Sequence, residues 1–197
     1  MGSFLIHISA LLALGILGIA AGPASSVGGD GAEASRTVTS TTHVNYKTAK
    51  SFAAVTADLE KQLGKFDPSI YGPSAGGKID PAEIEAKSRA MEGSSGLMIF
   101  AKYEHGSLLA LKGRKAAARQ YVIGNPLIAL QMTQVNILAG EYAPVRIYVY
   151  TGEDNLTHVD YDLPSSVFGR FGSAAIDQVA KGLDEKLERL VRNAVKE

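Results

Sequence analysis

The chain has 197 residues, a length that suits one domain together with a processing segment. Its 20 basic residues balance 20 acidic ones, so the sequence provides no large electrostatic field to attract nucleic acid or an anionic membrane. Cysteine is absent, which excludes disulfides, thiolate metal sites and cysteine nucleophiles. The composition therefore indicates an ordinary globular protein, and we expect no nucleic-acid partner.

The N-terminal segment has the pattern of a targeting signal. Residues 4–21 are apolar apart from His7 and Ser9, and small residues that suit a cleavage site follow them. We predict a signal peptide over 1–20, a flexible linker over 21–36 and a single domain over 37–197. The predicted location is secreted or in the cell envelope. An uncleaved membrane anchor, with the domain outside the cytoplasm, is the alternative.

The first part of the domain is predicted to contain one strand and two helices. Residues 38–46 are rich in β-branched side chains, which favours a strand. A helix follows to Leu63, where Gly64 ends it. Residues 65–79 contain Gly and Pro throughout and are predicted to form a loop. Asp80 and Pro81 then begin a short polar helix that ends at about Met91.

The second part is predicted to be mostly strands, with two further helices. The expected strands are 96–103, 107–111, 118–123, 145–150 and 156–161, and 107–111 has a helical turn as its alternative. Helices are expected from Pro126 and from Ser173 to Val195. Because the strands follow one another through short turns, the pattern predicts an α+β fold with a mostly antiparallel sheet. A two-layer sandwich with the helices on one face is the expected architecture.

Gly124, Asn125 and Pro126 separate a strand from a helix. Glycine permits backbone angles that other residues adopt only at a cost, asparagine can cap the helix, and proline fits the first helical position. The alternative is a binding site, in which Asn125 and the start of the helix hold an anion or a carbonyl.

This corner and two other stretches of the sequence resemble a known family. The chain resembles the DUF302 family, small domains of unknown function, in Glu104-His105-Gly106, in the "IGNP" turn and in "VRIYVY…HVDYDLP". The resemblance covers about residues 38–195, with a longer 65–95 segment and Gly106-Ser107-Leu108 as departures. It implies a two-layer sandwich with an antiparallel sheet. It implies no activity.

Several groups of residues have both a functional and a structural interpretation. Glu104 and His105 are the best acid/base pair, although a turn histidine that bonds the backbone is the simpler interpretation. His43, His158 and Asp160 lack the spacing of metal ligands, so no metal and no cofactor are predicted. The loop "GPSAGGKI" (72–79) lacks the hydroxyl residue of a phosphate-binding loop. Asn155 begins a glycosylation sequon.

Two further clusters are distributed along the predicted strands and turns. The tyrosines on predicted strands can either line a ligand cavity or pack at the edge of the core; they are Tyr103, Tyr121, Tyr148, Tyr150 and Tyr161. A basic cluster lies in one connection and is predicted to be a solvated turn; it comprises Lys112, Arg114, Lys115 and Arg119.

From these observations we expect an exported module that binds a small molecule or a protein partner. The expected site is where Glu104 and His105, the corner 124–126 and Tyr161 come together. The alternatives are a cofactor-free acid/base enzyme that uses Glu104 and His105, and a structural envelope or secreted protein. A homo-oligomer is a further option, and contact with a membrane is expected only if the N-terminal segment is not cleaved.

Overall fold

The computed structural model describes residues 34–71 and 80–197. The predicted signal peptide, the linker up to residue 33 and the stretch 72–79 therefore lie outside the described residues. The chain has two compact units, Met1–Val38 and Thr39–Glu197. Of the first unit, residues 34–38 are described, and they have no regular secondary structure. The architecture below is that of the second unit.

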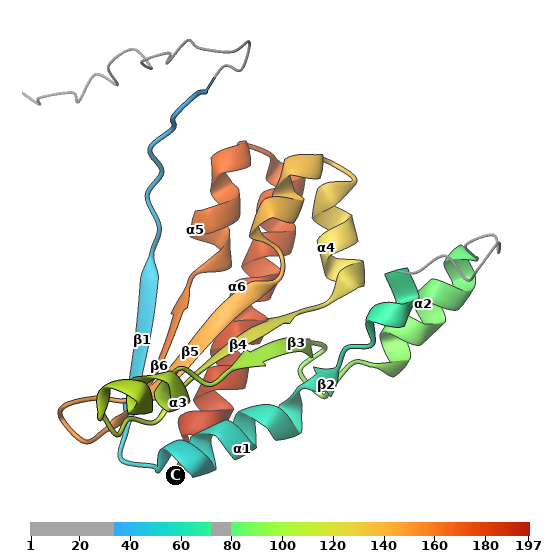
Figure 1. The fold of residues 1–197 in the computed structure, drawn as a ribbon. Coiled ribbons are helices and arrows are strands. Elements are labelled where there is room, and N and C mark those ends of the chain that lie inside the picture. The colour runs from blue at the N-terminus through green and yellow to red at the C-terminus, as the bar shows by residue number, and fades with distance from the viewer. Residues whose placement is uncertain (1–33, 72–79) are drawn as a thin grey trace, which may run out of the picture. The chain divides into compact units, whose positions relative to one another are not determined.

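The described part of this unit contains six strands and six α-helices, with short 3₁₀ helices between them (Figure 1). The strands are β1 (His43–Thr48), β2 (Gly64–Lys65), β3 (Met98–Tyr103), β4 (Ala118–Gly124), β5 (Val145–Thr151) and β6 (Thr157–Asp162). The α-helices are α1 (Phe52–Gln62), α2 (Pro81–Ala90), α3 (His105–Leu109), α4 (Pro126–Thr133), α5 (Pro164–Phe168) and α6 (Ala174–Val195). Short 3₁₀ helices are η1 (Pro68–Tyr71), η2 (Ala110–Lys112), η3 (Ile137–Tyr142) and η4 (Gly169–Phe171).

The strands form one sheet in the order β1-β6-β5-β4-β3-β2. Every pair is antiparallel except β2 with β3, which is parallel and joins only Gly64 and Lys65 to Met98 and Ile99. This confirms the predicted α+β fold with a mostly antiparallel sheet. The sequence analysis placed Gly64 at a helix end and Lys65 in a loop, so the parallel pair was not predicted.

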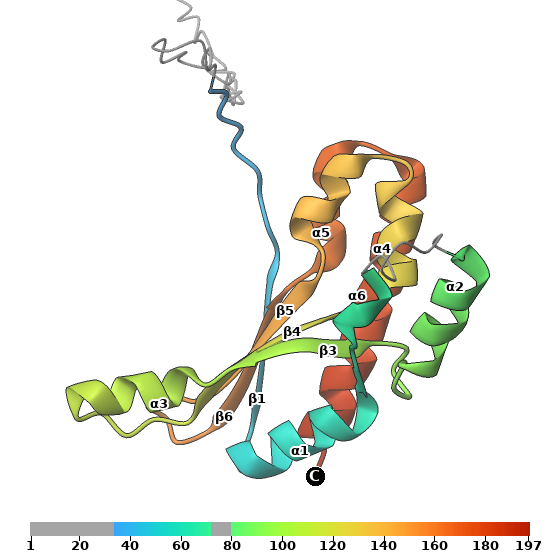
Figure 2. The ribbon, with the colours of Figure 1, turned by 45° about the vertical axis from the view of Figure 1, so that its right-hand side comes forward.

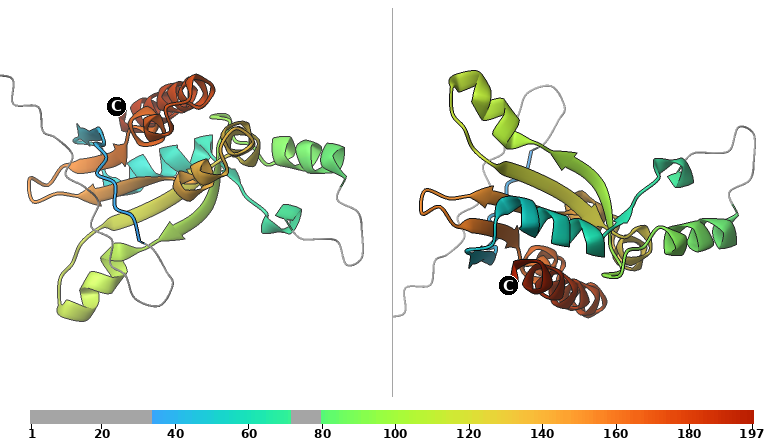
Figure 3. Two further views of the ribbon diagram at one scale, coloured as in Figure 1. Left: turned by 90° about the horizontal axis from the view of Figure 1, so that it is seen from above. Right: turned by 90° about the horizontal axis from the view of Figure 1, so that it is seen from below.

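Helices α1 and α6 pack on the same face of the sheet, which we call the inner face (Figure 3). Strand residues on this face are buried with Val55 and Leu59 of α1 and with the apolar stripe of α6; they include Tyr121, Ile123, Ile147, Val149, Val159 and Tyr161. The apolar stripe of α6 includes Ile176, Leu183, Leu187, Leu190 and Ala194, all of them buried. The opposite face of the sheet, called the outer face below, carries polar and aromatic side chains.

One predicted element type and one predicted boundary differ from the structure. Residues 107–111, expected as a strand, belong to α3 and η2, which project from the sheet edge (Figure 2). The leucines and alanine of this stretch favour helix. Gly106, near the start of α3, packs against the backbone of Ala116: an added β-carbon would lie 2.2 Å from the Ala116 carbonyl oxygen. Strand β1 also begins at His43 rather than at residue 38. Within the described residues, no helix combines the length and apolarity needed to cross a membrane.

Candidate functional site

The corner between β4 and α4 is built as its residues predict. Asn125 has extended backbone (φ −148°), and its side-chain oxygen accepts a hydrogen bond from the N–H of Leu127 at 2.8 Å. Pro126 occupies the first helical turn, where its missing N–H costs nothing. The interpretation of this stretch as a helix start is therefore confirmed.

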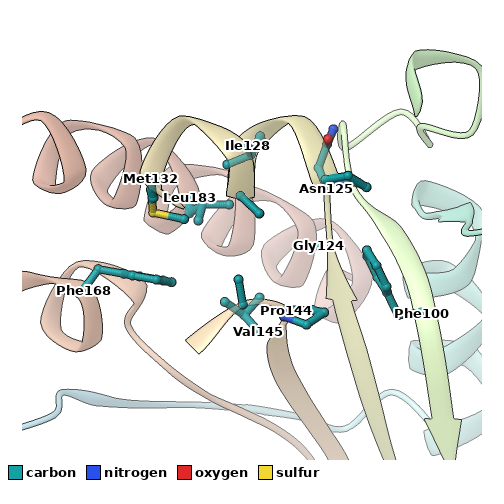
Figure 4. Close-up of a pocket in the computed structure, with 12 residues that line it drawn as sticks. Phe100, Gly124, Asn125, Ile128, Met132, Pro144, Val145, Phe168 and Leu183 are labelled. Atoms are coloured by element: carbon teal, nitrogen blue, oxygen red, sulfur yellow. The ribbon is translucent and has the colours of Figure 1, made fainter. Parts of the chain in front are cut away.

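The amide nitrogen of Asn125 holds the corner against the segment before β3. It donates to the Glu92 carboxylate at 2.8 Å and to the carbonyl of Gly96 at 2.9 Å. The residue is only 7% exposed, and Figure 4 shows its amide pointing away from the neighbouring apolar side chains. Both amide hydrogens are thus used within the fold, which leaves none for an anion or a carbonyl ligand.

Gly124 serves close packing rather than unusual backbone angles. Among the described residues, positive φ occurs at Gly96, Gly113, Gly172 and Asn155, and not at Gly124. A β-carbon on Gly124 would instead lie 3.3 Å from the β-carbon of Pro144 and 3.5 Å from the ring of Phe100. The expectation of a special φ at Gly124 is corrected: glycine is needed here because other side chains approach its backbone.

These close contacts border an apolar pocket of about 300 Å³, which we call the corner pocket. In Figure 4, Ile128, Met132 and Leu183 lie on one side, Pro144 and Val145 on the other, and Phe100 and Phe168 at the two ends. The full lining is Phe100, Gly124, Asn125, Pro126, Ile128, Ala129, Met132, Ala143, Pro144, Val145, Phe168 and Leu183. No charged side chain belongs to this lining, so the pocket suits an uncharged, apolar molecule.

The structure does not bring all the predicted site residues together. Gly124, Asn125 and Pro126 line the corner pocket, whereas Glu104 and His105 follow the opposite end of β3, where Tyr103 pairs with Gln120. Glu104 forms an ion pair with Arg119, and His105 packs edge-on against Tyr148 with ring centroids 5.7 Å apart. No hydrogen bond joins Glu104 to His105 in the described part of the chain.

Tyr161 lies on the inner face, away from both groups. It is 4% exposed and its ring is nearly parallel to that of Tyr46, with centroids 6.5 Å apart. Burial raises the pKa of its hydroxyl, and the neighbouring Tyr46 adds to the effect. Tyr161 is thus a core residue of β6.

The tyrosines on the strands belong to both faces and line no common cavity. Tyr121 and Tyr161 are buried on the inner face, while Tyr103, Tyr148 and Tyr150 lie on the outer face. The Tyr121 hydroxyl donates to Glu60 at 2.8 Å, and burial raises its pKa. The option of a single tyrosine-lined cavity is wrong, because alternate residues of a strand point to opposite faces.

The outer face brings together histidines and aspartates that are distant in sequence. His43 lies 3.1 Å from Asp162 and 3.4 Å from Asp160, and His158 lies 2.9 Å from Asp154. His158 is 7% exposed and stacks on Tyr150 at 4.8 Å. These contacts are side-chain hydrogen bonds and a ring stack. Within the described residues, no group of three such side chains is arranged to hold a metal ion.

The predicted basic cluster separates into two parts. Arg119 turns to the inner face and contacts Glu60 at 3.0 Å in addition to Glu104. Lys112, Arg114 and Lys115 are exposed around the turn after η2. Asn155 is exposed too, at the β5–β6 turn with φ 61°, a position that a modifying enzyme can reach.

Most residues that line the pocket were not predicted from the sequence. Phe100, Met132, Pro144, Phe168 and Leu183 come from β3, α4, the approach to β5, α5 and α6, and no motif links them. The one sequence signal that led to the pocket was the Gly-Asn-Pro corner.

The described fold and pocket define a small α+β domain with an antiparallel sheet and one apolar hollow beside a helix start. A family model described as "Domain of unknown function DUF302" matches residues 77–194. The chain belongs to this family, as the resemblance in its sequence predicted.

A solved structure supports the same fold. The crystal structure of an uncharacterized conserved DUF302 protein from Bacillus stearothermophilus is similar with a TM-score of 0.56 and 15% identity. The similarity covers 77% of this chain and 97% of that chain. At this identity the likeness shows the fold alone. A comparison with curated proteins found no match.

Proposed function

We propose that this DUF302 protein is a binding module that holds a small apolar molecule in the corner pocket. The observation that carries the proposal is the uncharged, apolar lining of a hollow of about 300 Å³. A dry apolar cavity of about 150 Å³ is large enough to bind benzene. The corner pocket therefore has room for a ligand larger than a single ring, and burial of its apolar surface provides the binding energy.

The same pocket argues for binding rather than chemistry. Its lining contains no titratable side chain, and general acid/base catalysis needs such a group within reach of the substrate. Glu104 and His105, the acid/base pair of the enzyme alternative, are engaged separately with Arg119 and Tyr148. No observation favours the enzyme alternative over binding.

Binding is tested with p-xylene and naphthalene as probes, by NMR of the methyl groups. We expect the signals of Ile128, Met132, Val145 and Leu183 to shift with saturation, whereas Ile137 and Leu138 on η3 keep their positions. Ala129→Leu fills the pocket and should abolish the shifts. Leu130→Phe is the matched control, because Leu130 is the next residue of α4 and is 55% exposed. Absence of saturable shifts in the folded protein would reject the proposal.

We also propose that the protein is exported, because residues 1–20 have the composition of a signal peptide. Expression of the full chain in a bacterial host, followed by N-terminal sequencing of the extracytoplasmic protein, tests it. A new N-terminus near Ala21 is expected for a signal peptide. Recovery of the whole chain in the membrane fraction supports the anchor, and recovery in the cytoplasm contradicts both.

A further inference from the structure

Helix α3 and its 3₁₀ continuation η2 project from the end of β3, as Figure 2 shows. This projection, defined here as residues 105–115, exposes two large apolar side chains: Leu108 is 62% exposed and Leu111 is 81% exposed. Residues three apart on a helical turn lie on the same side. The two leucines therefore form one small apolar surface that the rest of the fold does not cover.

Three cationic residues directly follow this apolar surface in the chain. Lys112, Arg114 and Lys115 are exposed, and the segment 105–115 contains no acidic residue. None of the three forms an ion pair with any residue that the structure describes. Gly113 has φ 70° and ends η2, so the chain reverses here and keeps the cations close to Leu111. Glu153 lines a shallow surface hollow together with Arg114 and Lys115, and it forms no ion pair with any described residue.

We infer that this projection docks on an anionic lipid bilayer. Exposed leucines beside unpaired cations are the combination that peripheral proteins use: the apolar side chains enter the interface, and the cations contact anionic headgroups. Charge complementarity selects this partner, because an apolar protein surface would leave the three cations unpaired. The balanced net charge of the whole chain does not oppose this, since charges on a projection act locally at physiological salt.

The inference is independent of the corner pocket, which lies at the other end of β3 and β4. It also needs no transmembrane segment, because docking leaves the bilayer core unspanned. From the sequence, the basic cluster was predicted to be a solvated turn, and membrane contact was predicted only through an uncleaved N-terminal segment. The structure adds that Leu108 and Leu111, next to these cations in the chain, are exposed.

Vesicle co-sedimentation tests docking, using the secreted or purified domain and two lipid compositions. We expect binding to phosphatidylcholine vesicles that contain phosphatidylglycerol, weak binding to pure phosphatidylcholine, and release at high salt. Each cation near a surface strengthens binding roughly fivefold. The triple variant Lys112→Gln, Arg114→Gln, Lys115→Gln should therefore bind about 100-fold more weakly.

Matched variants distinguish docking by this projection from general effects of net charge and surface hydrophobicity. Leu108→Ser with Leu111→Ser should weaken binding, whereas Ile137→Ser with Leu138→Ser should not, although Ile137 and Leu138 are 81% and 62% exposed. Lys65→Gln, Lys181→Gln, Arg189→Gln changes the net charge equally and should leave binding intact. No binding by the unmodified protein, equal binding to both lipid mixtures, or equal losses in test and control variants would overturn the inference. All variants alter exposed residues and are checked for folding by circular dichroism.

Discussion

A β-carbon placed on Gly124 would lie 3.3 Å from the β-carbon of Pro144. This contact joins the end of β4 to the residue that leads into β5, and both residues line the corner pocket. The absence of a side chain at Gly124 thus leaves one wall of the pocket as bare backbone.

We therefore expect Gly124→Ala to destabilise the protein by about 1 kcal/mol. Overpacking costs about 1–3 kcal/mol, and the reduced freedom of the unfolded chain offsets about 0.4–1 kcal/mol. Gly140→Ala is the matched control, because its new β-carbon would lie an ordinary 3.5 Å from Thr133. Urea unfolding of the two variants decides: equal stabilities would show that the approach of Pro144 does not restrict residue 124.

Asn125 and Asn136 begin two helical segments in the same way but with different further contacts. Both have extended backbone and accept a hydrogen bond from the residue two positions on. Asn125 in addition donates to Glu92 and Gly96. Asn125→Ala should cost about 2–3 kcal/mol and Asn136→Ala about 1 kcal/mol, measured by chemical denaturation. A similar cost for both would mean that the amide nitrogen of Asn125 contributes nothing.

Acid should weaken the junction of α1 with the end of α6. Lys50 donates to Asp58 at 2.5 Å and to the carbonyls of Ala194 and Lys196 at 3.0 and 2.9 Å. Hydrogen bonds from Lys50 and then Lys61 lower the pKa of Asp58 from 3.8 to about 2. Because its pKa is lower in the folded state, Asp58 stabilises the fold above pH 3.8. This stabilisation is lost as the pH falls toward about 2.

Thermal unfolding across this acidic range measures the effect. Asp58→Asn should remove that part of the pH dependence and should lower the melting temperature mainly above pH 3.8, where the carboxylate is charged in both states. A variant with the same melting curve as the original protein at every pH would contradict the assignment.

The contribution of His43 to stability should depend on pH with the opposite sign. The hydrogen bond to Asp162 raises its pKa above 6.5; burial opposes this slightly, and Asp160 adds to the increase. The stabilising contribution is complete below pH 6.5 and is lost as the pH rises through the folded-state pKa. NMR titration should place the pKa of His43 above 6.5, and Asp162→Asn should lower it. Asp67→Asn, the same charge change at a residue that bonds Ser69 instead, should not.

The longer helices and most strands could be predicted because they depend on local pattern, whereas β2 and α5 were not predicted. Ser51 and Ser173 cap the helices that the apolar spacing of Leu59 and Leu187 indicates, and both caps occur in the structure. Residues 107–111 are a short apolar run, for which periodicity does not distinguish strand from helix.

The candidate site depended on contacts that a sequence does not contain. The Gly-Asn-Pro corner was recognised as a local signal, yet Phe100, Phe168 and Leu183 reach the same pocket from elements far apart in the chain. Conversely, Glu104 and Gly124 were expected in one site, although Glu104 follows one predicted strand and Gly124 ends the next. In an antiparallel pair such positions fall at opposite ends, as the register of β3 with β4 shows.

A final consequence concerns the irregularity in β3, where Ile99 pairs with Ile123 but Ala101 pairs with Val122. Phe100 is the additional residue of this bulge, and everything after it has its orientation reset. Removing Phe100 would restore regular alternation in β3 and would leave Lys102 opposite Tyr121 and Tyr103 opposite Gln120, so Lys102 would keep its direction toward Glu60. A strand without this bulge residue would therefore keep its pairing with β4 but would lack the aromatic ring that lines the corner pocket.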